Sequence, residues 1–151
     1  MNQLNIETYN QNLFDISESK LHKCGILYIY GKYYIHKNKE NYIKLLVENI
    51  EKTIKISEKY NSLECIFYID LNNLKLKDYD ISFFKIIIKL VQEQYPSSLG
   101  KMIFVNVPIF VKTIYSLLKK MVSEDCRKKI FFEKKNKSKV FYTNTIDDID
   151  K

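Results

Sequence analysis

The stretch from Tyr95 to Phe132 constrains the fold of this chain more than any other part of the sequence. A Tyr-Pro turn leads into an unbroken apolar run, Met102–Val105, which predicts a strand. Residues 109–121 repeat apolar side chains at helical spacing, and residues 129–132 predict a further strand. Strand, helix and strand in this order form the unit from which parallel sheets are built. We therefore expect an α/β fold.

The remaining elements are predicted from the same two periodicities. The long helix should bury one stripe made by Ile43, Leu46, Val47, Ile50, Ile54 and Tyr60. The helix after Asp70 is apolar nearly all round, which is typical of a helix buried between layers. The expected elements are a short helix within 1–22, a strand at 25–30 turned by Gly31-Lys32 into a second strand at 33–36, a helix from Asn38 to Tyr60, a strand at 65–69, a helix at 79–93 and a short strand at 140–142.

The length of 151 residues suits one domain with a single core, and 46% of the residues are hydrophobic. No composition shift indicates a linker or a repeat. We expect a lead-in segment at 1–22, a core at 23–144 and an acidic end at 145–151, within one domain covering 1–151.

The charge is strongly basic, with a net charge of +7 and a pI of about 9.1. Such a charge admits nucleic acid or an anionic membrane as partners. Arg127 is the only arginine of the chain, and base readout and bidentate phosphate binding favour arginine over lysine. Sequence-specific nucleic-acid binding is therefore not favoured, and a solvated lysine surface remains the alternative to a functional patch.

Targeting and metal signals are weak. The most apolar run, Ile81–Val91, is interrupted by Lys85 and Lys89, and the N-terminal residues lack a signal-peptide pattern. A cytoplasmic protein with peripheral membrane contact is expected. Cys24, Cys65 and Cys126 have no metal-like spacing and predict small, semi-buried side chains in a reducing compartment.

The sequence contains little that indicates catalysis. Three isolated glycines cannot form a phosphate-binding loop. No nucleophile-elbow motif accompanies His22 or His36, so neither indicates a catalytic triad. Asp70 ends a buried strand, where a carboxylate either acts at the functional edge of a sheet or shapes the next loop. We expect no enzyme, no cofactor and no metal site.

The stretch from Tyr68 to Phe132 resembles the CRAL-TRIO lipid-binding domain, in the form found in phosphatidylinositol/phosphatidylcholine-transfer proteins. The family has a strand ending in D-L-K-G-[IL]-S, then a helix, Q-x-x-Y-P-E-R-L-G-K, a strand ending in N-A-P, and a final K-I-x-F strand. These motifs are matched by residues 70–75, 92–101, 106–108 and 129–132, and no gap is needed from Tyr95 to Phe131.

The resemblance implies a mixed, mostly parallel sheet that forms the floor of an apolar pocket, with the helix from Pro108 to Met121 as a lipid gate. An ordinary core helix would need the same apolar residues. The ligand contacts that it implies are Phe67, Ile69, Phe84, Ile88, Phe104, Phe110, Ile114, Leu117, Leu118, Met121 and Lys129.

The headgroup contacts are only partly matched. Phosphoinositide-binding members carry a Glu after Tyr-Pro and a Lys in the K-I strand, whereas this chain has Ser97 and Lys129. Lys139 could take the place of Lys129 in an alternative register. Lys75 and Lys77 suit an anionic headgroup rather than choline, although solvated loop lysines are the plainer interpretation.

The sequence thus predicts non-enzymatic binding and transfer of a hydrophobic ligand, foremost a phospholipid or phosphoinositide. Transient contact with an anionic membrane surface is expected. The alternatives are a pocket-less module of the same fold that docks on a protein or membrane and, third, a basic nucleic-acid binder.

Overall fold

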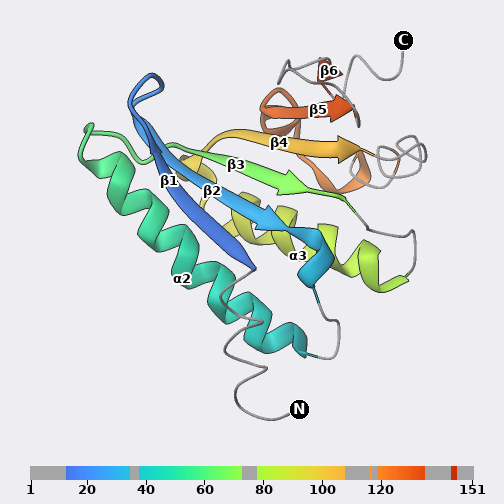
Figure 1. Cartoon of the computed structure of the whole chain (residues 1–151). Coiled ribbons are helices and arrows are strands. Elements are labelled where there is room, and N and C mark those ends of the chain that lie inside the picture. The colour runs from blue at the N-terminus through green and yellow to red at the C-terminus, as the bar shows by residue number, and fades with distance from the viewer. Residues whose placement is uncertain are drawn as a thin grey trace.

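In the part of the chain that the structure describes, six strands form one mixed sheet in the order β1-β2-β3-β4-β5-β6 (Figure 1). The neighbours from β2 to β5 are parallel, and β1 and β6 add antiparallel edges. This computed structural model describes residues 13–34, 38–72, 78–107, 116, 119–134 and 144–145. The elements are β1 (Phe14–Ser19), β2 (Cys24–Tyr30), η1 (Gly31–Tyr33), α2 (Lys39–Glu58), β3 (Cys65–Asp70), α3 (Asp78–Gln94), η3 (Pro96–Ser98), β4 (Leu99–Val107), α5 (Glu124–Arg127), β5 (Ile130–Lys134) and β6 (Asn144–Thr145). The predicted mostly parallel α/β sheet is confirmed.

The N-terminal part of the fold differs from the prediction. Residues 14–19 are a strand rather than part of a helix, and they pair with β2 through a turn at residues 20–23. Lys23 closes that turn in the left-handed region, with a φ of 54°. The predicted hairpin at Gly31-Lys32 is wrong, because η1 begins there and both edges of β2 are already taken by β1 and β3.

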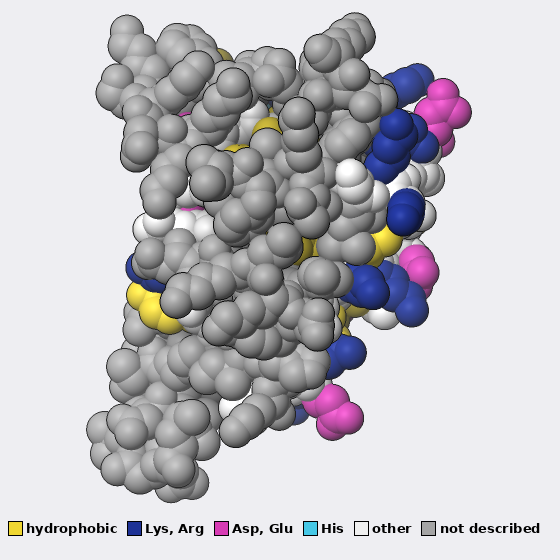
Figure 2. Space-filling view, turned by 90° about the vertical axis from the view of Figure 1, so that its right-hand side faces the viewer, with side chains coloured by type: hydrophobic (Ala, Val, Ile, Leu, Met, Phe, Trp, Pro, Cys, Tyr) yellow, Lys and Arg dark blue, Asp and Glu magenta, His cyan; other side chains and the backbone are white. Residues whose placement is uncertain are grey.

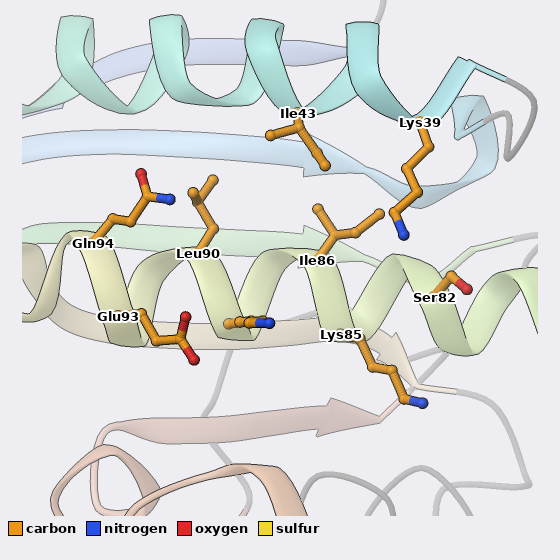
Figure 3. A pocket seen from close by; sticks show the side chains of 9 residues that line it. Lys39, Ile43, Ser82, Lys85, Ile86, Leu90, Glu93 and Gln94 are labelled. Carbon is orange, nitrogen blue, oxygen red and sulfur yellow. The ribbon is translucent and has the colours of Figure 1, made fainter.

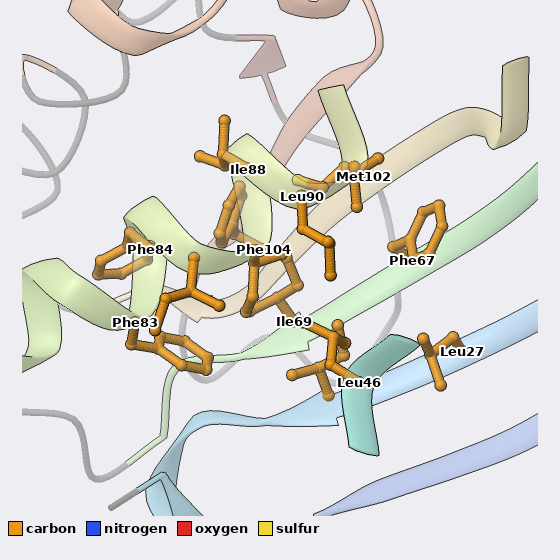
Figure 4. Packing of buried hydrophobic residues seen from close by; sticks show 14 of the residues in the cluster. Leu27, Leu46, Phe67, Ile69, Phe83, Phe84, Ile88, Leu90, Met102 and Phe104 are labelled. Atoms are coloured by element: carbon orange, nitrogen blue, oxygen red, sulfur yellow. The ribbon is translucent and has the colours of Figure 1, made fainter. Parts of the chain in front are cut away.

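Both long helices pack on one face of the sheet (Figure 1). Figure 4 shows Phe67 and Phe104 from the strands and Phe83 from α3 among the side chains of this apolar layer. Neighbouring aromatic rings in this core have centroids 5.1 to 6.3 Å apart along the series Tyr34, Tyr42, Phe83, Phe84, Phe104 and Phe132. Such aromatic packing contributes a large part of the apolar burial in a core.

Helix α2 lies unusually close to β2. A Cβ atom at Gly25 would collide with the carbonyl oxygen of Thr53, so only glycine fits there. Ser57 on the same helix face accepts a hydrogen bond from the Gly25 N–H at 2.9 Å and donates one to the Glu64 carbonyl at 2.7 Å. The buried stripe is therefore rotated from the predicted one, and it consists of Tyr42, Leu46, Ile50, Thr53 and Ser57.

The predicted elements of the C-terminal half agree with the structure wherever it is described. β3, α3 and β5 form where the pattern placed them, and β4 extends further on both sides than the predicted 102–105. Most of the predicted helix at 109–121 and the predicted strand at 140–142 lie outside the described residues, although residues 119–121 are helical.

The side chain of Gln92 links α3 to the segment that leads into β5. Its amide nitrogen donates to the Met121 carbonyl at 3.1 Å, and its amide oxygen accepts from the Ser123 N–H at 2.8 Å. Ser123 in turn caps α5, because its hydroxyl accepts from the Cys126 N–H at 3.3 Å. The described end of the helical segment is thereby fixed to α3.

Candidate functional site

The face of the sheet opposite α2 and α3 has its own, smaller apolar cluster. Side chains alternate along a strand, so all of its residues except Cys24 are sequence neighbours of residues in the main core. We call this cluster the apolar band; it consists of Cys24, Ile26, Ile66, Tyr68, Ile103, Val105 and Phe131. It crosses β2, β3, β4 and β5, and several of its side chains are only half-buried.

A hollow of about 380 Å³ lies where this face meets the carboxyl ends of the parallel strands. Ligands of open α/β sheets bind at this edge. The rings of Tyr28 and Tyr68 stack in it, with centroids 5.0 Å apart and planes 14° apart. We call it the carboxyl-edge hollow; it is lined by Tyr28, Ile29, Tyr30, Tyr68, Asp70, Val105, Asn106 and Glu133.

Asp70 and Asn106 form the polar rim of this hollow. Oδ1 of Asp70 accepts from Nδ2 of Asn106 and from the Asn72 N–H, each at 2.8 Å. Asn106 has a φ of 56°, in the left-handed region that asparagine tolerates better than most residues. The pairing with β5 shifts register around it, as in a β-bulge. Asp70 therefore shapes the loop after β3, as one interpretation of the sequence held, and also holds β4 at the edge.

Glu133 is the least satisfied polar group of the hollow. Only 8% of the residue is exposed, and its Oε2 atom has no hydrogen-bond partner among the described residues. Burial raises the pKa of its carboxyl group above the ordinary range. A buried carboxyl oxygen without a partner is costly, and it is therefore ready to accept a hydrogen bond from a ligand.

Tyr30 adds a fixed hydroxyl group beside these acids. Its OH donates to Oδ2 of Asp15 at 2.7 Å. This hydrogen bond to Asp15 and partial burial raise the pKa of Tyr30 to about 12. Tyr30 therefore stays protonated at physiological pH. Among the described residues that line the hollow there is no lysine or arginine, so its chemistry favours hydroxyl or ammonium donors over anions.

The opposite, amino-terminal edge of the same face is basic. A second hollow, of about 180 Å³, is lined by His22, Lys23, Cys24, Ser62, Glu64, Cys65, Ile66, Gly100 and Lys101. We call it the amino-edge hollow. Nζ of Lys101 lies 5.8 Å from the ring centroid of Phe131 in the apolar band. The basic and acidic edges are about 13 Å apart from Lys129, directly before β5, to Glu133 within it, because a strand rises about 3.3 Å per residue.

The thiols at this edge are not activated. Burial raises the pKa of Cys65 to about 11, and burial also raises the pKa of Cys24. A thiol with a raised pKa is mostly protonated and a poor nucleophile or metal ligand. Among the described residues, no three His, Cys, Asp or Glu side chains are grouped so that they could hold a metal ion.

A third depression lies between the two helices, on the outer side of the molecule (Figure 3). It has a volume of about 390 Å³, and Ile43 of α2 faces Ile86 and Leu90 of α3 across it. Lys39, Lys85 and Lys89 contribute cations to its lining, and Glu93 an acid. We call it the helix groove. It belongs to the layer of helices and not to the sheet face with the apolar band.

These features can be set beside known proteins. The sequence matches the CRAL/TRIO domain over residues 15–148, most of its length. The chain belongs to the CRAL/TRIO family. It is 47% identical over 45 residues to the phosphatidylinositol transfer protein SFH5 of Kluyveromyces lactis, a match covering 30% of this chain and 15% of that protein.

The crystal structure of Sfh5 resembles this CRAL/TRIO domain in three dimensions. The TM-score is 0.56 at 25% sequence identity, and the match covers 83% of this chain and 48% of the Sfh5 chain. The domain therefore spans about half the length of that structure and a smaller part of the curated relative. No helix in the described part of the chain is long and apolar enough to cross a membrane.

The expected ligand contacts of the CRAL/TRIO domain fall into three groups. Five of them lie in the core beneath α2 and α3 rather than on the apolar band, and these are Phe67, Ile69, Phe84, Ile88 and Phe104. Met121 is half-buried against the same core. The others lie outside the described residues: Lys75, Lys77, Phe110, Ile114, Leu117 and Leu118. The ligand role of all of these residues stays a prediction.

The two described headgroup candidates lie at the amino-terminal ends of neighbouring strands. Ser97 is exposed in η3, directly before β4, and Lys129 is half-buried directly before β5. The Lys129 carbonyl accepts from the Met102 N–H at 2.8 Å, which ties Lys129 to the sheet. Its alternative, Lys139, lies outside the described residues.

The residues that line the carboxyl-edge hollow were not singled out from the sequence, except for Asp70 and Asn106, which lie in matched motifs. Tyr28, Tyr30 and Tyr68 alternate with core residues, so their period of two was the available signal. Glu133 follows an apolar strand without any motif. Deciding which face of each strand is covered requires the position of the helices, which the strand sequence does not contain.

Proposed function

We propose that this domain binds a hydrophobic ligand, foremost a phospholipid, and transfers it reversibly without covalent chemistry. Family membership supports the class of ligand, and the apolar band is the observation that supports a binding surface. The name of the relative SFH5 refers to phosphatidylinositol transfer, and that activity is extended to this domain as part of the proposal.

The apolar band provides the driving force in this proposal. Each methylene group of an acyl chain that leaves water contributes about 0.8 kcal/mol, so a few ordered methylenes offset the loss of ligand freedom. The ligand lies along the band between the two polar edges. A gate formed by residues 108–121 completes the proposed pocket.

The two edges distinguish the parts of a headgroup. Lys101 and Lys129 at the amino-terminal edge suit a phosphate as point charges. Glu133 and the tyrosines at the carboxyl-terminal edge suit hydroxyl or ammonium groups, because carboxylates accept hydrogen bonds and aromatic faces attract cations. A phospholipid with a polar substituent on its phosphate offers both kinds of group.

Native mass spectrometry of the chain purified from cells tests the proposal. We expect one phospholipid mass per chain, released by organic extraction. Val105→Lys places a charge where the band meets the carboxyl-edge hollow, and it is expected to lower lipid occupancy about tenfold or more, because a buried charge is strongly unfavourable beside acyl chains. Asn41→Lys, at an exposed position of α2 on the helix-covered side of the sheet, is the matched control.

The result that contradicts the proposal is a folded protein without lipid. If no phospholipid, sterol or fatty acid accompanies the chain or enters it from vesicles, the domain does not function as a carrier. Circular dichroism and thermal unfolding of Val105→Lys show whether a loss of lipid reflects a loss of fold.

The helix groove favours a second candidate, a docking module for an acidic partner. Lys39, Lys85 and Lys89 surround its apolar floor, and charge complementarity points to an acidic amphipathic helix. Figure 2 shows lysine and arginine side chains along one side of the molecule with acidic side chains among them. Binding of an acidic peptide that is lost in Lys85→Glu, with lipid occupancy unchanged, would establish this candidate.

A further inference from the structure

Two leucines are conspicuous on the described surface. Leu21 is 86% exposed and Leu63 is 48% exposed, and they are the exposed large hydrophobic side chains among the described residues. Leu21 lies in the turn between β1 and β2, and Leu63 lies in the loop between α2 and β3. A single exposed leucine is ordinary on a protein surface, whereas two at neighbouring loops form a pattern.

The turn and the loop lie side by side at the amino-terminal edge of the sheet (Figure 1). Lys23 from the turn and Ser62 from the loop line the same amino-edge hollow. An ion pair joins the two segments, because Nζ of Lys59 at the end of α2 lies 3.7 Å from Oε1 of Glu18 at the end of β1. The two leucines therefore belong to one surface.

Hydrogen bonds hold both segments in place. The His22 N–H donates to the Ser19 hydroxyl at 3.0 Å within the turn. In the loop, the Glu64 N–H donates to the Ser62 hydroxyl at 3.1 Å, and the Glu64 carbonyl accepts from Ser57 at 2.7 Å. Leu63 is thus presented from a backbone tied to α2. Little ordering is needed for either leucine to contact a partner.

The charges around the leucines are mainly positive. Lys20 and Lys23 flank Leu21 in the turn and are exposed, and Lys59 is exposed at the end of α2. Lys101 adds a half-buried cation from β4. The acids of this surface are Glu18, which pairs with Lys59, and the exposed Glu58 and Glu64. Tyr60, half-buried next to Lys59, adds an amphipathic ring of the kind enriched at membrane interfaces.

We infer that this surface, called the amino-edge tip, docks on an anionic lipid bilayer, with Leu21 and Leu63 entering the headgroup region and the lysines contacting lipid phosphates. Leucines at the tips of basic loops partition into the boundary between headgroups and acyl chains, and lysine attraction to anionic lipid adds to their affinity. A protein partner fits less well, since a stable interface buries about 800 Å² per partner around a packed apolar centre.

The inference names the contact surface of the carrier proposed above, but it does not depend on a lipid being carried. Lipid occupancy and vesicle binding are separate measurements. A chain that carries no lipid and still binds anionic vesicles through this tip contradicts the proposed function alone. A chain that carries lipid and does not bind vesicles contradicts this inference alone.

Co-sedimentation with vesicles tests the docking. The probes are vesicles of phosphatidylcholine alone and of phosphatidylcholine with phosphatidylserine. We expect binding to the anionic vesicles, weakened by salt. The pair Leu21→Ser and Leu63→Ser should weaken it about tenfold or more, because apolar surface then no longer leaves water. Both side chains are substantially exposed, so the double variant should fold, which circular dichroism checks.

A matched pair of charge reversals separates the tip from the net charge. Lys20→Glu with Lys23→Glu should weaken binding about tenfold or more. Lys32→Glu with Lys44→Glu changes the net charge equally at exposed positions outside the tip and should leave most of the binding intact. Equal losses in the two pairs, wild-type binding by the leucine variant, or no binding of the wild type to anionic vesicles would each overturn the inference.

Discussion

The two faces of the sheet are made by alternate residues of the same strands, and they serve different ends. Phe67 is fully buried beneath the helices, whereas its neighbour Tyr68 lies on the opposite face and stacks on Tyr28. The helix-covered face is built of large apolar side chains in contact with one another. The other face has a smaller apolar band between a basic and an acidic edge.

The difference shows how one sheet can supply both stability and a binding surface. On the covered face, a close approach such as that of Gly25 to Thr53 leaves no room for an extra atom. On the other face, an unpartnered carboxyl oxygen and a strained asparagine remain, and these are costs that a fold optimised only for stability would remove.

The largest expected effect comes from a pair of truncations in β3. Phe67→Ala should lower the free energy of unfolding by about 3 to 5 kcal/mol, because it leaves a cavity in a packed core. Tyr68→Ala should lower it by only about 1 kcal/mol and instead reduce lipid occupancy. Urea unfolding and native mass spectrometry measure the two effects. Similar losses of stability in both variants would show that the faces are equally packed.

A smaller effect is expected at the rim of the hollow. Asn106→Ala should cost about 2 kcal/mol, because it removes the hydrogen bond to the Asp70 carboxylate and leaves alanine at a positive φ. Asn106→Gly keeps the favourable backbone and should recover about 1 kcal/mol of that loss. Thermal unfolding of the two variants separates strain from hydrogen bonding. Equal stabilities would mean that the backbone at this position is not strained.

The smallest effect concerns Glu133. Its raised pKa means that the folded state binds the proton more tightly than the unfolded chain, so this group's contribution to stability is full at low pH. That contribution is lost as the pH rises from the ordinary value of 4.5 through the raised folded pKa. Glu133→Gln should remove this dependence, a change of about 1 kcal/mol for each unit of pKa shift.

Urea unfolding at a series of pH values measures this difference between wild type and Glu133→Gln. Glu124→Gln, at an exposed position of α5, is the control and should follow the wild type. Asp70, on the same hollow, remains in both proteins, and Tyr30, with a pKa of about 12, does not titrate in this range. A constant difference across the pH series would show that Glu133 is solvated like an ordinary glutamate.

The sequence was sufficient for the elements with long, regular patterns. Helix α3 and strand β3 have many apolar residues in a row, so tertiary contacts could not change their type. Strand β1 was missed, because Leu13 and Ile16, three residues apart, fit a helical spacing and its partner β2 is not visible in the local sequence. The family resemblance, based on ungapped motifs, predicted the topology better than periodicity alone.

The candidate site was less accessible to prediction. A search for pocket walls selects the most apolar positions, and in this chain the described ones, such as Phe104 and Ile88, lie in the main core. The long-range hydrogen bond from the Gly25 N–H to Ser57 helps to set the rotation of α2, while the Thr53 hydroxyl donates to the Asn49 carbonyl within the helix. Polar residues are not expected to direct a helix into a core. The apolar band and its two edges emerge only when the covered face of the sheet is known.

The short antiparallel strands at the margins of the sheet also bear on aggregation. An exposed strand edge invites pairing with a second chain, and fibres begin in this way. In β1, Asp15, Ser17 and Glu18 put polar or acidic groups along the outer margin, so a second copy aligned there would bring carboxylates together. At the other margin, β6 pairs through only two residues. Parallel strands pair through long-range contacts and therefore fold slowly. The polar and short edges keep the sheet from pairing with other copies of the chain during that time.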